Sequence, residues 1–362
     1  MSVINLPTME QMDVHNTLLA SIASHIGTDG IKISNWEDVQ RLVRMGLAAK
    51  MFKPGDQFLA NYDGTPYAFN VIGIDHDIPT DPKYTHSITL QPHACLLTGM
   101  FDAPEALYYA ETELHAGVQK FAIGETIYEF TTENDLAIGG QIVPSAWTGE
   151  VPTQVKTYAS ATSTDVIETL TVSVSSGDIT LTPLNNLLRT HHGSNNYIES
   201  GIKQWLNSAA ATFVWEAKTI YDRPLTSPNV KGFLNLLDAD LVAVLGAVNK
   251  QVARNTVTDD GGQDTFSDKV FLPSGIEVYG TTEGTVTGES AYEYFSVNAA
   301  APTDATRAWR VKYLSAAARI WWLRSPRVSY SHNPRFVGSA GDVSSFGGAN
   351  GALGLAPACC IV

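Results

Sequence analysis

The chain has 362 residues, a formal net charge of −14 and 44% hydrophobic residues, a composition typical of a folded globular protein. Nucleic-acid binding depends on clustered basic side chains that neutralise phosphates, and this acidic sequence has no such cluster, so we expect no nucleic-acid partner. The first residues lack the cationic and apolar stretches of a signal peptide, and no apolar run is long enough for membrane insertion.

Residues 1–50 are predicted to form an N-terminal helical segment. Thr8 and Gln11 fit a capping box, and the apolar positions that follow recur near a helical period: Met12, Leu18, Leu19, Ile22 and Ile26. A second capping box, Ser34 with Glu37, precedes a stretch that ends at Gly46 and whose buried face holds Val39, Leu42 and Val43. Two short helices are therefore expected before the main domain.

Strands and turns replace this pattern from about residue 51. "FLANYDGTPYAFNVIGID" predicts a hairpin that turns at Asp63-Gly64, and "HSITLQPHACLL" predicts another strand. "APEALYYAETEL" is predicted to be a helix. Residues 118–184 are rich in Thr, Ser and Val and are predicted to be an inserted β-rich segment.

The second half of the chain mixes helices with short strands. "NNYIESGIKQWLNSAAA", with Ser200 or Asn196 as its cap, and "DADLVAVLGAVNKQVA" are predicted helices, whereas "DKVFLP" and "RIWWLRS" are predicted strands. Alternation along the last strand puts Trp321 and Leu323 on one side and Trp322 and Arg324 on the other. Pro326 ends that strand, and the residues beyond it are expected to be loop. Together these elements predict the α+β class.

The sequence contains no phosphate-binding loop, no zinc-protease helix and no serine nucleophile elbow. A set of imidazoles and carboxylates has the chemistry of a divalent-metal site: Asp75, His76, Asp77, His86 and His93. The alternative is a solvated loop followed by ordinary histidines, and we adopt it, as we do for His191 and His192. We therefore predict no metal and no cofactor.

The three cysteines are too few for a disulfide framework and indicate a reducing compartment. Cys359 and Cys360 are adjacent, so on a strand they point to opposite faces and are poorly placed to hold one ion together. We expect at least one of them to be a buried structural residue.

Several motifs occur in the order seen in one known family: "FKPGDQF", "YAFNVIGID", "SNNYIESGIKQWLNS", "DKVFLPSGIEVYG", "WWLRSP" and "GLAPACCIV". In this respect the chain resembles the prophage-associated variable proteins of diversity-generating retroelements, which have a C-type-lectin-like fold, similar to that of formylglycine-generating enzymes. The resemblance runs from about residue 51 to the end, apart from the insertion. It implies a single lectin-like domain over residues 51–362, with the chain end buried in a strand.

In these retroelements a reverse transcriptase rewrites adenine positions at the 3′ end of a gene, so the resemblance implies a diversified region over residues 324–362. Asn-type template codons with a fixed third pyrimidine never yield Lys, Glu, Gln, Met or Trp. These five types make up 51 of the 362 residues, so residues 327–353 should hold about four of them, yet they hold none. An ordinary Gly- and Ser-rich loop also lacks long polar residues, and this alternative stays open.

The implied template keeps five positions fixed, namely Val328, Pro334, Val337, Gly341 and Val343. The variable, ligand-binding positions are then Arg327, Ser329, Tyr330, His332, Asn333, Phe336, Gly338, Asp342, Ser344, Ser345, Phe346, Gly347, Gly348, Asn350, Gly351 and Leu353. Aromatic residues give contact area at a low entropic cost, and Ser, Gly and Asn give adaptable hydrogen bonds, as in antibody loops. We expect these positions to face solvent.

The resemblance implies a non-enzymatic protein of phage or prophage origin that binds a protein or glycan ligand on a bacterial surface. It places the chain on the virion, or in the bacterial cytoplasm before assembly, with residues 1–50 available for homo-oligomer formation or virion attachment. The alternative is an oxidase-type enzyme related to formylglycine-generating enzymes. Those enzymes use two separated cysteines with copper, whereas here the two cysteines are adjacent.

Overall fold

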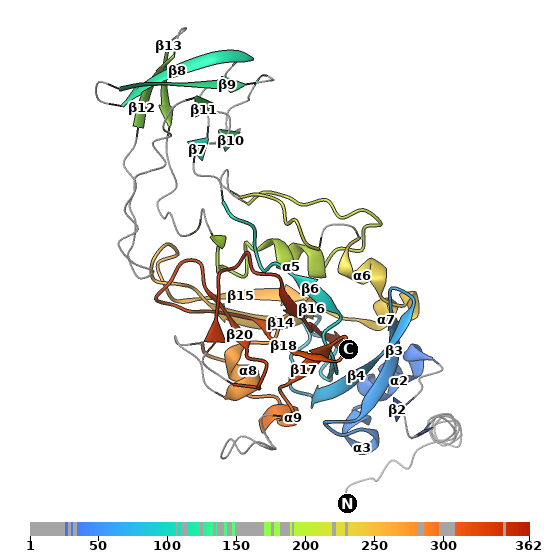
Figure 1. The fold of residues 1–362 in the computed structure, drawn as a ribbon. Helices are drawn as coiled ribbons and strands as arrows, with labels where there is room; N and C mark the ends of the chain where they lie inside the picture. Colours follow the sequence, from blue (N-terminus) through green and yellow to red (C-terminus); the bar gives the residue numbers. More distant parts are fainter. Residues whose placement is uncertain are drawn as a thin grey trace, which may run out of the picture.

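The structure is a computed structural model that describes most of the chain from residue 35 onward. The described residues are 26–27, 30–31, 35–105, 108–109, 115–123, 126–132, 135, 141–142, 147–148, 170–174, 177–181, 189, 192–218, 222–228, 231–280, 286–296, 308–342 and 345–362. Over these residues the architecture is mixed and rich in short sheets, with few and short helices (Figure 1). This agrees with the predicted α+β class.

A seven-stranded sheet forms the centre of the fold. Its strands, in spatial order, are β1 (Ile26–Gly27), β2 (Gly30–Ile31), β3 (Gln57–Tyr62), β4 (Thr65–Ile74), β5 (Ile88–Pro92), β23 (Ala358–Ile361) and β16 (Val270–Phe271). Only the β2–β3 pair is parallel among these described strands. The predicted hairpin is confirmed, because β3 and β4 are joined at Asp63 and Gly64, whose φ angles of 48° and 76° suit a tight turn.

The last strand of the chain lies inside this sheet. β23 pairs with β5 on one side and with β16 on the other, and all four of its residues are buried. The predicted burial of the chain end in a strand is therefore confirmed. Cys359 packs in one hydrophobic cluster and Cys360 in another, so the two side chains do point to opposite faces.

A five-stranded sheet carries most of the region after residue 320. Its spatial order is β21 (Ser345–Phe346), β20 (Pro334–Val337), β19 (Trp321–Pro326), β22 (Leu353–Leu355) and β6 (Leu97–Gly99). β19 ends at Pro326 as predicted. The expectation that everything beyond is loop was wrong, because four strands follow, two of them packed against β19.

The remaining described strands form small separate sheets. Two hairpins belong to the body of the fold: β14 (Val248–Ala253) with β15 (Gln263–Asp268), and β17 (Lys312–Leu314) with β18 (Ala317–Arg319). The predicted insertion contributes β8 (Gly117–Ile123), β9 (Thr126–Thr132), β10 (Gln141–Ile142), β11 (Trp147–Thr148), β12 (Leu170–Val174) and β13 (Gly177–Leu181). Strands β8, β9, β12 and β13 lie together at the top of Figure 1, and the β-rich prediction is confirmed at these described residues.

The helices are short and cover the central sheet. They are α2 (Trp36–Arg44), α3 (Ala48–Met51), α5 (Gly201–Leu206), α6 (Phe233–Leu236), α7 (Ala239–Val244), α8 (Gly275–Tyr279) and α9 (Glu293–Ser296). The predicted helix before Gly46 is α2, although its cap is Asn35, whose side chain accepts from the Glu37 amide at 2.8 Å. Ser200 caps α5 as predicted.

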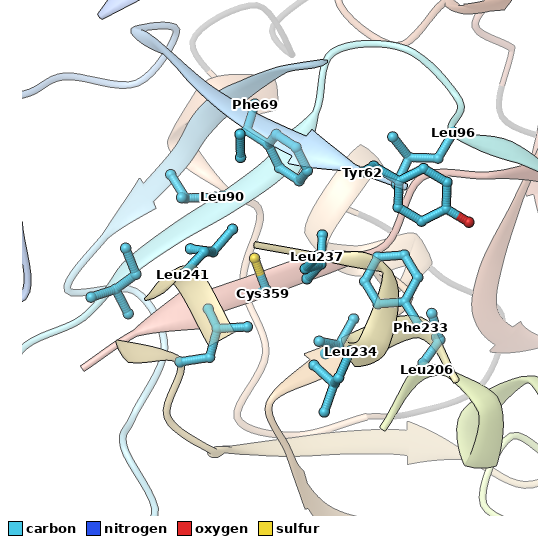
Figure 2. Close-up of a cluster of buried hydrophobic side chains, with 14 of the residues drawn as sticks. Tyr62, Phe69, Leu90, Leu96, Leu206, Phe233, Leu234, Leu237, Leu241 and Cys359 are labelled. Atoms are coloured by element: carbon cyan, nitrogen blue, oxygen red, sulfur yellow. The ribbon is translucent and has the colours of Figure 1, made fainter. Parts of the chain in front are cut away.

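The core beneath these helices joins residues that are distant in the sequence. Leu241 of α7 and Phe233 of α6 lie over the sheet residues Leu90 and Cys359 (Figure 2). Trp322 belongs to this cluster, whereas Trp321 and Leu323 belong to the cluster on the opposite side, as the alternation predicted. Burial of these large side chains is the main favourable contribution to folding.

Three helix predictions fail where the structure describes the chain. Ile26 lies in β1, Tyr108–Tyr109 form the strand β7, and Val248–Ala253 form β14, so the predicted helix over residues 238–253 stops at Val244. β-Branched and aromatic residues that find a partner strand override a helical period in short windows. The rest of the predicted first helix, from Thr8 to Ile22, and Ser34 lie outside the described residues.

Candidate functional site: the C-terminal face

The predicted variable positions lie in the loops and edge strands around β20, β21 and β22. Eleven of them are exposed or half-buried, and we call this set the C-terminal face: Arg327, Ser329, Tyr330, Phe336, Asp342, Phe346, Gly347, Gly348, Asn350, Gly351 and Leu353. Gly338 is buried. Ser344 and the side chain of Ser345 lie outside the described part of the chain.

Asn195 fixes the loop over residues 327–333 of this face from its buried side. Asn195 is fully buried, and its amide nitrogen donates to the carbonyl of Tyr330 at 2.6 Å and to those of Arg327 and Asn333 at 3.3 Å each. Its side-chain oxygen accepts from the Asn255 amide at 2.8 Å. The asparagine therefore fixes three carbonyls of one loop at once.

Further hydrogen bonds from outside fix the rest of the loop. Thr256 donates to the carbonyl of Val328 from its main-chain nitrogen at 2.8 Å and from its hydroxyl at 3.0 Å. The Asn195 main-chain nitrogen donates to the Ser331 carbonyl at 3.0 Å. These contacts reach main-chain atoms of the loop, so its backbone path does not depend on which side chains it carries.

Two side chains of this loop and one from β21 gather into a cluster of one arginine and two aromatic rings. The guanidinium carbon of Arg327 lies 3.9 Å from the centre of the Tyr330 ring and 3.7 Å from that of Phe346. The two rings are 6.0 Å apart and inclined by 28°. Such contacts stabilise an exposed cation by about 0.5 to 1 kcal/mol each. We refer to these three residues as the arginine–aromatic cluster.

Besides Gly338, two more predicted positions do not face solvent. The side chains of His332 and Asn333 are buried, at 4% and 6% exposure, which corrects the expectation for them. His332 stacks on His192 at 5.0 Å between ring centres, and burial together with that neighbour lowers the pKa of His332 to about 4. This imidazole is therefore neutral at pH 7 and acts as packing beneath the face.

Phe336 is half-buried, because its ring packs edge-on against Trp322 at 6.0 Å. Trp322 is fully buried and donates its indole N–H to the carbonyl of Gly99 at 2.9 Å. Phe336 therefore belongs partly to the core. Tyr330 is half-buried as well, whereas Phe346 is exposed.

The predicted fixed positions have structural reasons to be fixed. Val337 is fully buried, Pro334 is buried in β20, and Gly341 has φ = 77°, which favours glycine. Gly338 contrasts with its prediction as variable, because a side chain there would meet the carboxylate of Asp342. A change at 338 therefore requires a change at 342. Val343 lies outside the described residues.

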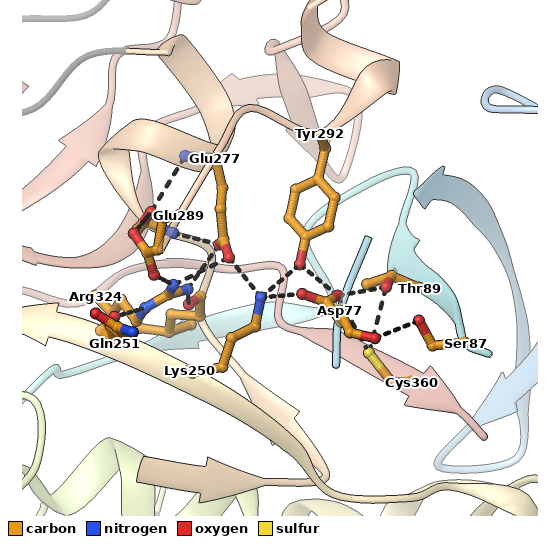
Figure 3. A network of polar contacts seen from close by, with 12 residues as sticks. Asp77, Ser87, Thr89, Lys250, Gln251, Glu277, Glu289, Tyr292, Arg324 and Cys360 are labelled. Carbon is orange, nitrogen blue, oxygen red and sulfur yellow. Dashed lines mark hydrogen bonds and ion pairs between the residues drawn. The ribbon is translucent and has the colours of Figure 1, made fainter. Parts of the chain in front are cut away.

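A second polar site lies deep in the fold, and we call it the charge cluster: Asp77, Lys250, Glu277, Glu289 and Arg324. Figure 3 shows Lys250 between the carboxylates of Asp77 and Glu277, with Arg324 paired to Glu277 and Glu289. Lys250 donates to Glu277 at 2.5 Å, and Arg324 donates to the same carboxylate at 2.7 Å. β14, α8 and β19 supply Lys250, Glu277 and Arg324.

For Glu277 and Lys250 these contacts outweigh the cost of burying the charge, whereas burial raises the pKa of Glu289. Burial by itself works to raise the pKa of Glu277, but Arg324 and Lys250 lower it far below its ordinary value. Burial likewise disfavours the charged form of Lys250, yet Asp77 and Glu277 raise its pKa. Tyr292 donates to Asp77 at 2.8 Å and completes the cluster. We interpret the arrangement as a structural ion-pair network.

The residues that the sequence offered as a metal group are separated by the fold. Asp75 pairs with His86 at 3.1 Å, while Asp77 pairs with Lys250. His93 instead lies beside the amides of Gln57 and Asn70. His76, Asp77 and Glu277 do lie near one another, but the Lys250 ammonium already contacts both carboxylates and holds the place that a cation would take.

The cysteines do not have the surroundings of reactive thiols. Cys95, Cys359 and Cys360 are buried and free. Burial raises the pKa of Cys95 to about 11 and that of Cys359 to about 12, and it also raises that of Cys360. Since the thiolate is the reactive form, these environments favour inert structural residues.

Sequence reasoning missed the residues that build these two sites. The sequence pattern indicates only a helix start at Asn195 and a helix around Lys250. Glu277 stands out in the sequence only as part of the motif "DKVFLPSGIEVYG". Apart from the capping box of Ser274 with Glu277, the partners of these three residues are tens to hundreds of residues away, as in the 135-residue separation of Asn195 and Tyr330. A single sequence carries no periodic signal for such pairs.

Comparison with known proteins adds one match. The family described as a domain of unknown function, DUF6273, matches residues 175–362, which is more than half of the chain and includes the whole C-terminal face. No curated protein and no solved structure matches the chain. Among the helices that the structure describes, none has the length and apolar character to cross a bilayer.

Proposed function

This chain belongs to the DUF6273 family, and from that premise we propose that it is a non-enzymatic binding protein whose ligand docks on the C-terminal face. We further propose that the domain is C-type-lectin-like and that a retroelement diversifies the face. The family description assigns no activity, so the proposal rests on the geometry of the chain itself.

The observation that carries the proposal is the way the loop over residues 327–333 is held. Its carbonyls are fixed by Asn195 and Thr256, which both lie outside the proposed variable region. A binding surface that changes its side chains needs a backbone that does not depend on them. Hydrogen bonds from constant side chains to variable-loop carbonyls meet that need.

The division between fixed and variable positions supports the same conclusion. Val337 and Gly341 are required by burial and by backbone conformation, and both are fixed in the proposed template. Ser329 and Phe346 are exposed and are proposed to vary. Exposed residues away from special features usually change stability by less than about 0.5 kcal/mol, so such a surface can vary without loss of the fold.

We propose a phage or prophage origin, with a ligand on the bacterial surface. In this view the chain acts on the virion after assembly in the bacterial cytoplasm. The N-terminal segment over residues 1–50 then serves virion attachment or homo-oligomer formation. An oxidase-type activity has less support, because burial keeps Cys359 and Cys360 as thiols in separate clusters.

A combinatorial library tests the proposal directly. Arg327, Ser329, Tyr330 and Phe346 are randomised together, and the fraction of folded variants is measured by proteolysis. We expect most variants to stay folded and some to acquire new ligands in selection. A matched library at four buried positions, Val337, Trp322, Leu323 and Leu355, should contain few folded variants. Similar folded fractions in the two libraries would contradict the proposal.

The genome gives an independent test. A reverse-transcriptase gene and a near-copy of the sequence encoding residues 324–362 should lie beside this gene, with adenines at the variable codons. A copy whose differences fall on the fixed codons of Val328, Pro334 and Val337 would contradict the diversification.

A further inference from the structure

We propose that Arg327 makes the C-terminal face a receptor for a carboxylate, and that its partner is a protein segment carrying Asp or Glu. The inference rests on the proposed function, since it assigns a ligand chemistry to that same surface. The inference is drawn from the side-chain donors of Arg327, whose guanidinium lies against the rings of Tyr330 and Phe346.

The Arg327 guanidinium is oriented but unpaired. Its guanidinium carbon contacts the rings of Tyr330 and Phe346 at 3.9 and 3.7 Å, and among the described residues no carboxylate or carbonyl accepts a hydrogen bond from its side chain. Several buried arginines of the described chain differ in this respect. Arg189 and Arg324, for example, are both paired with carboxylates. Arg327 therefore keeps a fork of N–H donors available to a ligand.

The position of this fork is set before any ligand arrives. The main-chain nitrogen of Arg327 donates to the Asn333 carbonyl at 2.8 Å, and its own carbonyl accepts from the Tyr330 nitrogen at 3.0 Å and from Asn195. Phe346 is held by strand pairing with Arg335. Because backbone and rings are both fixed, little conformational entropy is lost when the guanidinium binds.

The chemistry of the fork selects a planar anion. Guanidinium groups match carboxylates through two parallel N–H···O bonds, and charge-assisted bonds of this kind are about twice as strong as neutral ones. The imidazole of His332, beneath the face, lies 5.9 Å from the Tyr330 ring between ring centres and is kept neutral by burial, so Arg327 supplies the cationic charge of the cluster. A single fixed fork suits one carboxylate rather than a polyanion.

The aromatic groups that contact the Arg327 guanidinium favour a protein segment over a sugar. Phe346 is 38% exposed and offers no hydrogen-bonding group, and the amide side chain of Asn333 is buried. Recognition of sugar hydroxyls relies on several exposed polar groups, whereas an arginine beside aromatic rings is the composition of protein-interface hot spots. An acidic side chain flanked by apolar residues fits this surface.

Selection from a phage-displayed library of random dodecapeptides on the immobilised full chain tests the inference. We expect the selected peptides to be enriched in Asp and Glu relative to the starting library. For one selected peptide, its Glu→Gln or Asp→Asn version and the R327A protein should each lose roughly 30-fold in affinity, the loss typical of a hot-spot anchor. R327K keeps the charge but not the fork and should show an intermediate loss.

The matched control is R319A, which removes an exposed arginine from β18, outside the face. It should leave affinity unchanged, and circular dichroism should show that R327A remains folded. Selected peptides without acidic enrichment, or equal affinity for wild type and R327A, would overturn the carboxylate inference. If F346A still weakened binding in that case, the proposed binding surface would stand. If no variant of the C-terminal face altered binding, the carboxylate inference and the proposed binding surface would both be disproved.

Discussion

The side-chain amide of Asn195 donates a 2.6 Å hydrogen bond to the main-chain carbonyl of Tyr330, across 135 residues of sequence. Through this contact a fully buried residue of the scaffold determines where a half-buried aromatic residue of the C-terminal face lies. The backbone of the loop is thereby held by the scaffold, while Ser329 of the same loop is exposed. Removing this contact should therefore affect the loop that carries Tyr330.

Asn195→Ala should loosen the loop over residues 327–333. The substitution removes one donor from the carbonyls of Arg327, Tyr330 and Asn333. Among the described contacts the Tyr330 carbonyl is then left without a donor, and an unsatisfied group of this kind costs about 1 to 3 kcal/mol. We expect a loss of about 2 kcal/mol or more in the free energy of unfolding, measured by urea denaturation. Amide exchange in the loop should also become faster. Ser329→Ala, at an exposed position of the same loop, should change neither quantity.

Combined substitution of the arginine–aromatic cluster should be well tolerated. Replacing Arg327, Tyr330 and Phe346 together removes contacts worth about 0.5 to 1 kcal/mol each and opens no cavity in the core. Trp322→Ala should instead cost about 3 to 5 kcal/mol, because its buried ring and its hydrogen bond to Gly99 are lost. Comparable losses in urea denaturation for the two proteins would contradict the assignment of the cluster to the surface.

Glu277→Gln should destabilise the fold strongly. It removes the charge that Lys250 and Arg324 share, and breaking a buried ion pair from one side costs about 3 to 5 kcal/mol. Glu37→Gln, on the exposed side of α2, is the control and should have little effect. A small loss for E277Q would mean that the charge cluster is not a structural network.

The same carboxylate should make stability depend on acid. Burial opposes ionisation of Glu277, but Arg324 and Lys250 lower its folded-state pKa below the ordinary value of 4.5. Its contribution is therefore fully present above about pH 4.5 and is lost as the pH falls further. In urea denaturation at pH 3 to 6, wild type should lose stability more steeply toward acid than E277Q. Parallel curves would argue against this coupling.

Lys312 should also make stability rise with pH, but in a higher pH range. Burial lowers its pKa from 10.5 to about 7, and the only described acceptor for its ammonium is the Pro92 carbonyl. Between these two values the unfolded chain binds the extra proton, so the free energy of unfolding should rise with pH. Relative to Lys312→Met, wild type should gain up to about 1.4 kcal/mol per pH unit above pH 7. Lys53→Met, which changes an exposed lysine, should show no such trend.

Removal of residues 357–362 should abolish the native fold. β23 lies between β5 and β16, so its loss would divide the central sheet and expose the helices packed over it. We expect the truncated chain to lack a cooperative thermal transition by circular dichroism. Cys359→Ala keeps the strand and should retain that transition at a lower temperature. A truncated chain with a normal melting curve would disprove the central role of this strand.

The local elements of this fold could be predicted from the sequence alone because their signals lie within a few residues. Asp63-Gly64 predicts the turn between β3 and β4, Ser200 predicts the start of α5, and Pro326 predicts the end of β19. Where a window carried both helical and strand signals, as at Val248–Ala253, the partner strand decided. Strand pairing adds cross-strand contacts that no single window records.

The sites were decided only by the tertiary structure. Asp77 and Lys250 are 173 residues apart and Asn195 and Tyr330 are 135 apart, and each pair meets because sheet order and loop packing bring them together. The sequence by itself determined which residue types the C-terminal region holds and which positions along it were candidates for variation. Packing decided that His332 and Asn333 lie beneath the surface and that Arg327 lies on it, because burial depends on what the rest of the chain places above each side chain.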